Sequence, residues 1–390
     1  MNVVREYLGR NVRQYGIVAA LLVIVLLFQV LTEGRLLYPD NIASLIQQNA
    51  YVMILAIGMV MVIVAGHIDL SVGSVAAFVG GLAAIMLVDW ELPWFATVLV
   101  ALLVGALVGA WQGFWIAYVG IPAFIVTLAG MLIFRGLAIV LVGTTVAGLP
   151  AEFNAIAGGY LPPLLGFAGQ ADGLTLVIGL VGIAGLAWSQ WRARRALIKH
   201  QLTAEPPVIF VAKLVVIALL IGVVTYWLSL SARGTPIVLL IVGALILVFS
   251  FVLNRTVFGR HVYAVGGNRH AAILSGVNAQ RTDFAIFVNM GLLAAVAGII
   301  TTSRAGAGVA AAGTNFELDA IAACFIGGTA VAGGVGRISG AMIGALIMGV
   351  LNMGLSILAV DPAWQQVIKG LVLLLAVALD IVSKRRGRLT

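Results

Sequence analysis

The chain has 390 residues, of which 62% are hydrophobic and 9% are charged, and its formal net charge is +8. Soluble domains carry about 25% charged residues, so this composition provides too little polar surface for a soluble fold. The basic residues stand in short clusters between apolar runs, as in the inside loops of membrane proteins, which argues against nucleic acid as a partner. Unbroken runs long enough to cross about 30 Å of hydrocarbon recur along the chain. They predict an all-α polytopic membrane protein surrounded by lipid.

Twelve apolar segments are expected to form about 12 transmembrane helices within a single transmembrane domain, residues 1–390. In chain order they are residues 16–32, 42–66, 71–88, 94–119, 122–143, 172–190, 207–229, 235–254, 283–303, 316–333, 338–359 and 362–382. Basic residues precede the first segment and no small-residue cleavage site follows it, so we expect an uncleaved first span.

The basic residues also predict the orientation of the chain. Arg5, Arg10 and Arg13 place the N-terminus inside, and the tail SKRRGR (383–388) places the C-terminus inside too. The basic stretch WRARRALIKH (191–200) then also falls inside, and the acidic turn DWELPW (89–94) falls outside. We therefore expect a multi-pass protein of a prokaryotic inner membrane with both termini in the cytoplasm.

Two segments depart from the simple pattern of spans. Residues 316–333 are rich in Gly and Ala and form either the weakest span or a re-entrant half-helix. Residues 144–171 are interrupted by Gly and Pro, which predicts a short helix and turn on the outer surface.

A faint internal repeat relates residues 62–81 to residues 329–349. Each copy has an apolar helix, a glycine-bearing break, a charged residue, a serine two positions later and a helix rich in Gly and Ala. Asp69 and Ser71 correspond in this way to Arg337 and Ser339. Opposed copies of such broken helices often line a transport pathway at the bilayer midplane.

Sequence motifs for enzymatic chemistry are missing. The chain has no P-loop, no HExxH, no GxSxG and no metal-ligand spacing of Cys and His. Its single cysteine, Cys324, cannot form an internal disulfide. We therefore predict no catalytic residues, no cofactor and no metal site, and expect that the protein is not an enzyme.

The longest polar stretch, residues 254–282, is basic and falls in an inside loop. Within it, AAILSG (271–276) can form a short helix that is entered through the flexible GGN. One interpretation is a dock for a soluble partner, and the other is a solvated loop that only sets the topology.

Two further motifs lie inside apolar segments and contain candidate residues for the translocation pathway, most of them polar. GHIDLSVGS (66–74) contains Asp69, Ser71 and Ser74, and IPAFIVTLAGMLIFRG (121–136) contains Phe124, Thr127 and Arg135. Ionisable groups in a membrane are costly without partners, so Asp69 lines a polar pathway or sits at the inner boundary of the membrane. Arg135 must face protein or water, and both a structural partner and a role in transport stay open.

These motifs, together with FGRHVYAVGGNRHAAILSGVN and LDAIAACFIGGTAVAGGVGRISGAMIGA (318–345), occur in the order of a known pattern. The chain resembles the membrane subunit of bacterial sugar ABC importers, the ribose/xylose permease group related to the branched-chain amino-acid permeases. The likeness extends from residue 41 nearly to the end and is greatest to the xylose type, which shares ELDAIAAC, TLAGML and an extra pair of spans. A multiple-monosaccharide permease is also similar. Gln112 departs from the pattern, which usually has Asn there.

The resemblance implies a type II-like ABC importer permease with a ten-helix core and an extra helix pair at 172–229. It implies that two copies form a homodimeric pore, that a cytoplasmic ABC ATPase subunit drives it, and that an extracytoplasmic sugar-binding protein delivers a xylose-like pentose. The stretch 254–282 would then be the cytoplasmic coupling loop. Its implied ATPase-coupling residues are Gly259, Gly266, Gly267, Asn268, Ala271, Ala272, Ser275 and Gly276.

Four more residues are candidates for the translocation pathway: Asn315, Glu317, Asp319 and Ser339. The first three are expected to face outward and could instead contact the binding protein. An alternative to the importer is a stand-alone secondary transporter or channel for a small neutral solute, with Asp69 and Arg135 as its coupling residues. An integral membrane enzyme is a third reading, which the missing motifs argue against.

Overall fold

The computed structural model describes residues 2–202 and 205–386, and it is helical apart from two pairs of very short strands. The helices, in chain order, are α1 (Asn2–Leu31), α2 (Pro39–Val64), α3 (Val72–Val88), α4 (Trp94–Phe114), α5 (Ala123–Val142), α6 (Ala151–Gly158), α7 (Gly173–Lys199), α8 (Pro207–Ser229), α9 (Ile237–Arg255), α10 (Val257–Gly267), α11 (Arg269–Leu274), α12 (Ala279–Ala305), α13 (Phe316–Ile326), α14 (Ile338–Ile357) and α15 (Pro362–Arg386). The side chains of Arg5, Arg10 and Arg13 lie outside the described residues, as does the end of the tail SKRRGR.

Short elements join these helices. A 3₁₀ turn (Arg35–Leu37) precedes α2, and a π-helical turn (Trp115–Val119) extends α4. Strand β1 (Thr145–Ala147) pairs antiparallel with β4 (Ala307–Val309), with Thr145 opposite Val309, and β2 (Phe167–Ala168) pairs with β3 (Ala171–Asp172). Residues 144–171 thus hold a short helix and strand pieces, as expected for a segment that does not span.

Eight helices in the described part of the chain are long and apolar enough to cross a membrane: α2, α4 with its π-helical turn, α5, α7, α8, α9, α12 and α14. Residues Gly16–Leu31 of α1 and the whole of α3 are shorter apolar helices. The expected full span at 316–333 is wrong, because α13 has 11 residues and is only about 16 Å long at 1.5 Å per residue. The half-helix alternative describes this segment better.

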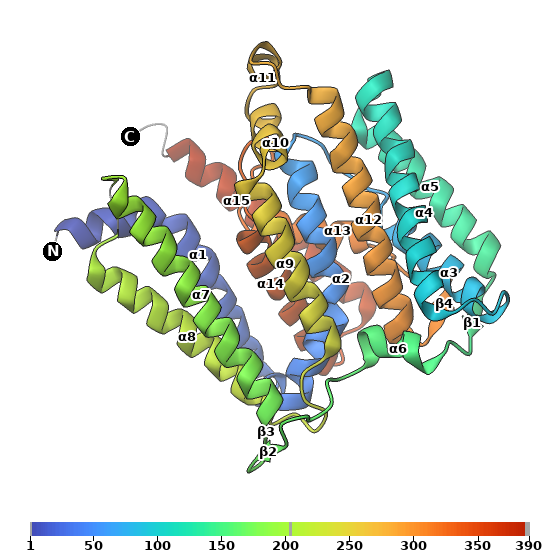
Figure 1. The fold of residues 1–390 in the computed structure, drawn as a ribbon, viewed down its shortest axis with the longest axis horizontal. Helices are drawn as coiled ribbons and strands as arrows, with labels where there is room; N and C mark the ends of the chain where they lie inside the picture. Colours follow the sequence, from blue (N-terminus) through green and yellow to red (C-terminus); the bar gives the residue numbers. More distant parts are fainter. Residues whose placement is uncertain (1, 203–204, 387–390) are drawn as a thin grey trace.

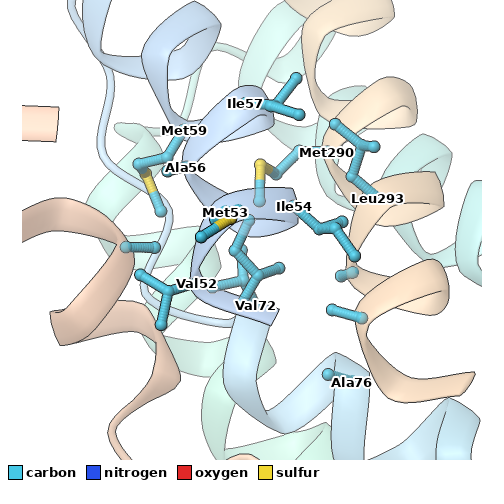
Figure 2. Close-up of a cluster of buried hydrophobic side chains, with 14 of the residues drawn as sticks. Val52, Met53, Ile54, Ala56, Ile57, Met59, Val72, Ala76, Met290 and Leu293 are labelled. Carbon is cyan, nitrogen blue, oxygen red and sulfur yellow. The ribbon is translucent and has the colours of Figure 1, made fainter. Parts of the chain in front are cut away.

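Helix α2 runs through the centre of the bundle. From Val52 to its end, apolar side chains cover all its faces, as expected for a helix that is buried on every side, and Ile54, Leu55 and Met59 are fully buried. Figure 2 shows this core, where Met290 and Leu293 of α12 approach α2. Gly58 provides the space for them, since a Cβ at that position would lie 2.5 Å from the Met290 sulfur.

Helices α4 and α12 pack backbone to backbone. A Cβ on Gly109 would lie 2.3 Å from the carbonyl oxygen of Phe287, and one on Gly291 would lie 2.3 Å from that of Gly105. In lipid there is little hydrophobic force between helices, so small residues that permit close packing stabilise the contact. This contact ties α12 firmly to the bundle.

Helices α7 and α8 form a hairpin at the periphery, packed on each other, with α8 also touching α2 (Figure 1). The chain leaves the core and returns to it at adjacent points: the Leu161 N–H donates to the Thr235 carbonyl at 2.9 Å, and the Ile237 N–H donates to the Gly159 carbonyl at 3.0 Å. Asp172 caps α7 by accepting a hydrogen bond from the Thr175 N–H at 2.9 Å.

The molecule has two distinct ends, which we name by one helix each. The α11 end carries α10, α11, the start of α1, the end of α15 and the loop between α7 and α8, whereas the α6 end carries α6 and the short strands (Figure 1). The predicted inside stretches, residues 191–200 and 254–282, therefore lie at the same end.

Candidate functional site

The first helix break, residues 65–71, lies between α2 and α3. Its Asp69 is 2% exposed and accepts hydrogen bonds from the Ser71 N–H at 2.8 Å and the Ser71 hydroxyl at 2.6 Å. Gln112 of α4 donates from its amide to the Ser71 hydroxyl at 2.7 Å. Asp69 and Ser71 thus bind each other within the break, and Gln112, the residue that departs from the family pattern, holds their loop to α4.

The start of α3 lies against the start of α13. A Cβ on Gly73 would lie 2.2 Å from the Gly313 carbonyl oxygen and 2.3 Å from Oε2 of Glu317. Two helices shorter than a full span, of 17 and 11 residues, therefore meet at their N-termini, with Ser74 and Glu317 buried beside the junction. Positive helix ends favour nearby carboxylates, and broken-helix ends of this kind form substrate sites in transporters.

Helix α5 contacts the segments that precede both half-helices. The Thr127 hydroxyl lies 3.3 Å from the Ile68 carbonyl oxygen in the first break. Arg135 donates from Nη1 to the Ala312 carbonyl at 2.6 Å and the Ala310 carbonyl at 3.3 Å, in the loop before α13. Arg135 therefore has a structural partner, while Phe124 is exposed on the outside of α5.

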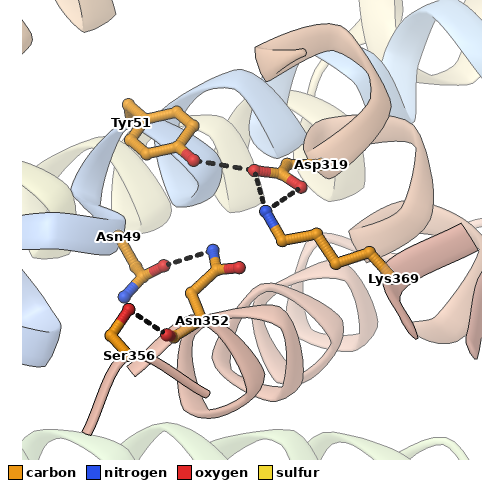
Figure 3. Close-up of polar contacts among 6 residues, drawn as sticks. All are labelled: Asn49, Tyr51, Asp319, Asn352, Ser356 and Lys369. Carbon is orange, nitrogen blue, oxygen red and sulfur yellow. Dashed lines mark hydrogen bonds and ion pairs between the residues drawn. The ribbon is translucent and has the colours of Figure 1, made fainter. Parts of the chain in front are cut away.

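Asp319 belongs to a polar cluster inside the bundle, shown in Figure 3. Its carboxylate accepts a hydrogen bond from the Tyr51 hydroxyl at 2.7 Å and pairs with the Lys369 ammonium at 3.3 Å. Nearby, the Asn352 amide lies 3.3 Å from Oδ1 of Asn49. These residues come from α2, α13, α14 and α15, so the cluster joins four helices through polar contacts that lipid cannot replace.

Glu317 and Asp319 are both buried, because α13 begins inside the bundle. The expected outward orientation of Asn315, Glu317 and Asp319 stays a prediction. Asn315 is half-buried and adopts φ +65° just before α13.

The predicted coupling loop, residues 254–282, contains α10, which is fixed to the end of α2 and to the second helix break, residues 327–337. A Cβ on Gly266 would lie 1.6 Å from the Val64 carbonyl oxygen, and that same oxygen accepts a hydrogen bond from the Gly334 N–H at 2.8 Å. The Tyr263 hydroxyl donates to the Gly336 carbonyl at 2.6 Å. Gly259 allows the sharp turn from α9, since a Cβ there would lie 2.2 Å from the Leu253 carbonyl oxygen.

Helix α11 is the outermost part of the loop. Asn268 caps it by accepting a hydrogen bond from the Ala271 N–H at 3.0 Å. Five of the predicted coupling residues are exposed here: Gly267, Asn268, Ala271, Ser275 and Gly276. Sequence reasoning missed two exposed apolar side chains of α11, Ile273 and Leu274, of which Leu274 is 89% exposed. The sequence signal that could have identified them is the presence of two apolar residues in the middle of a basic, polar loop.

Ala272 differs from the other predicted coupling residues. It is 5% exposed and packs in a small core with Val265 and Ala279. It therefore packs against α10 and α12 of its own chain, and its implied role in coupling stays a prediction.

Ser339 lies at the N-terminal start of α14 and does not join the Asp69 network. It lines a cavity of about 550 Å³ with Asn254, Tyr263, Arg337 and neighbouring glycines. This cavity opens between α1, α10 and the second break, so the two breaks carry different polar surroundings despite their similar sequences.

Comparison with known proteins separates the α7–α8 hairpin from the rest of the chain. The family model described as branched-chain amino acid transport system / permease component matches residues 41–160 and 230–377, leaving out α7 and α8. The chain is 44% identical to the xylose transport system permease protein XylH of Escherichia coli (strain K12), over 97% of this chain and 94% of that protein. XylH of Haemophilus influenzae is 41% identical over 96% and 98%, and the ribose import permease protein RbsC of Escherichia coli (strain K12) is 34% identical over 93% and 91%. No solved structure matches the chain.

Proposed function

Because the chain belongs to the branched-chain amino acid transport system / permease component family, we propose that it is the membrane-spanning subunit of an ATP-driven importer for xylose or a related pentose. Relatives named as xylose permeases are more similar to it than the ribose import permease is, and they match it over nearly its whole length. The protein is a transporter subunit and not an enzyme. Its importer needs a separate cytoplasmic ATPase subunit, an extracytoplasmic sugar-binding protein and a second copy of the permease.

One observation carries the mechanism: the coupling loop contacts the end of α2, where the first break begins, and the second break. Gly266 packs against the Val64 carbonyl, and Tyr263 binds the Gly336 carbonyl. Closure of an ATPase dimer on the exposed tip of α11 would move α10, and α10 would move the segments that precede α3 and α14. The exposed Ile273 and Leu274 provide an apolar contact for the ATPase, since the fully buried core of a protein interface is more apolar than its rim.

The proposed topology places the α11 end in the cytoplasm, with both termini there. The eight long spans, α1, the half-helices α3 and α13, and α15 make twelve membrane-inserted helices. The exposed basic residues near the end of α7, such as Arg192 and Arg195, support this orientation under the positive-inside rule. Helices α7 and α8 are the extra pair beside a ten-helix core.

The pathway is proposed to pass between the meeting ends of α3 and α13. Serine, glutamine and backbone carbonyl groups there suit the hydroxyl groups of a neutral sugar, which needs hydrogen-bond partners and no counter-ion. A stand-alone secondary transporter has less support, because Asp69 is hydrogen-bonded within its own loop and Arg135 is held by backbone carbonyls.

Reconstitution in vesicles tests the proposal. The permease is combined with the ATPase and the sugar-binding protein that copurify with it, and accumulation of radiolabelled xylose is followed with ATP on the cytoplasmic side. Uptake is expected only when all parts are present, and an ATPase variant lacking its Walker lysine is expected to abolish it. Accumulation of xylose against a gradient by the permease alone would refute the proposal.

A further inference from the structure

Asp283 of α12 joins α11 to the first break through an ion pair with Arg269 and a close contact with His67. The side chain is 1% exposed, Oδ2 lies 2.7 Å from Nη2 of Arg269, and Oδ1 lies 3.2 Å from Nε2 of His67. Arg269 is the first residue of α11, and His67 belongs to residues 65–71. One buried carboxylate therefore links its own helix, α12, to two other segments, α11 and residues 65–71.

The three segments differ in how firmly they are held. Asp283 stands near the start of a 27-residue helix that packs backbone to backbone on α4. Arg269 heads a helix of six residues beside Gly267, and His67 follows Gly66, which has φ +88°. A buried carboxylate keeps its charge only with partners close by, so movement of either partner disturbs the other.

We propose that Asp283 is a positioning residue that transmits displacement of α11 to the first break, and through it to the start of α3. Within residues 65–71, Asp69 binds Ser71, which directly precedes α3. Tyr263 serves the second break by its separate contact with Gly336. The coupling loop thus acts on the two breaks through different residues. This inference rests on the proposed function for its role in transport, but the link itself can be measured in the permease alone.

The first experiment uses the full-length permease in nanodiscs without partners and follows amide hydrogen exchange. Arg269→Gln is expected to raise exchange at least threefold both in α11 and in residues 65–71. Asp283→Asn is expected to do the same. The double variant, Arg269→Gln with Asp283→Asn, is expected to raise exchange no more than Asp283→Asn alone, because Asp283→Asn already breaks the contact that Arg269→Gln removes. Arg269→Lys keeps the charge and is expected to restore most of the protection.

The matched control is Arg192→Gln, which neutralises an exposed arginine of the peripheral helix α7 at the same end of the molecule. It is expected to leave exchange in residues 65–71 unchanged. Unchanged exchange in this segment for Arg269→Gln would overturn the proposal, and so would a double variant whose effect equals the sum of the two single effects.

The second experiment compares ATP hydrolysis with xylose uptake in the reconstituted complex. Asp283→Asn and Arg269→Gln are expected to keep hydrolysis within twofold of the unmodified complex while uptake falls at least tenfold. A parallel fall of both rates would overturn the transmitting role, since it would indicate general damage. If the unmodified permease bound no ATPase, the proposed function would fail, whereas the exchange experiment would still decide whether Asp283 links the two segments.

Discussion

The ion pair between Lys369 and Asp319 allows a quantitative prediction about the stability of the bundle. Lys369→Met removes the cation and keeps an apolar side chain of similar length. Asp319 is 4% exposed and would retain the Tyr51 hydroxyl as the remaining donor in its cluster. Removing one partner of a buried ion pair costs about 3–5 kcal/mol, and because the Lys369 side chain is 23% exposed we expect the lower value, about 3 kcal/mol.

The assay uses the single cysteine of the chain. Cys324 is fully buried, so a fluorophore that becomes bright on reacting with thiols reports unfolding as the purified permease is heated. At roughly 2 °C for each kcal/mol, Lys369→Met is expected to lower the unfolding temperature by about 6 °C. Lys213→Met is the matched control. Lys213 pairs with Glu205 at the same 3.3 Å on the peripheral α8, but the Glu205 side chain is 23% exposed against 6% for the Asp319 side chain, so water can solvate its charge and loss of the pair is expected to cost less.

The double variant Asp319→Asn with Lys369→Met separates a lost ion pair from general damage. An amide can still accept the Tyr51 hydrogen bond and leaves no unpaired charge, so the double variant is expected to unfold within about 2 °C of the unmodified protein. The reasoning is refuted if Lys369→Met unfolds at the unmodified temperature, or if the double variant loses the sum of the two single effects.

Three further predictions concern single positions. Gly109→Leu is expected to prevent a monodisperse protein on size exclusion because its side chain meets the α12 backbone within 2.3 Å, whereas Gly136→Leu enters open space and serves as control. Gly266→Ala is expected to lower the unfolding temperature by several degrees, since its Cβ would clash with the last carbonyl of α2, while Gly267→Ala meets no atom within 4 Å and should match the unmodified permease in the same assay. Gln112→Leu removes a buried hydrogen bond and is expected to cost about 1 kcal/mol, measured by the same thermal unfolding; an unchanged unfolding temperature would contradict the role of this amide.

Much of the bundle could be predicted from the sequence because lipid imposes a simple rule. A span must be apolar for about 20 residues and must pair its own backbone groups as a helix, and α2, α4, α5 and α12 follow this rule. The end of α13 at Ile326 could not be placed in this way. It depends on the approach of Gly327 to Gly340, where a Cβ would lie 2.4 Å from the Gly340 carbonyl oxygen, and composition does not reveal such tertiary contacts.

For the candidate site, the sequence indicated which polar residues need a partner inside the bundle, but it did not indicate which residues those partners are. An ionisable group in an apolar run predicts that a partner exists, which marks Asp69 and Arg135. It does not say which residue the partner is, because Arg135 binds a carbonyl 177 positions away and Lys369 binds a carboxylate 50 positions away. Helical spacing relates only neighbours three or four positions apart. The functional roles of these residues stay predictions.

The closeness of residues 161 and 235 makes the α7–α8 hairpin an insertion with a single closed neck. A linker of a few residues between these two points could replace the hairpin without moving the helices on either side, because their backbones are already hydrogen-bonded to each other. Changes in the length of α7 and α8 are therefore expected to leave the geometry of the helices on either side of this neck unchanged.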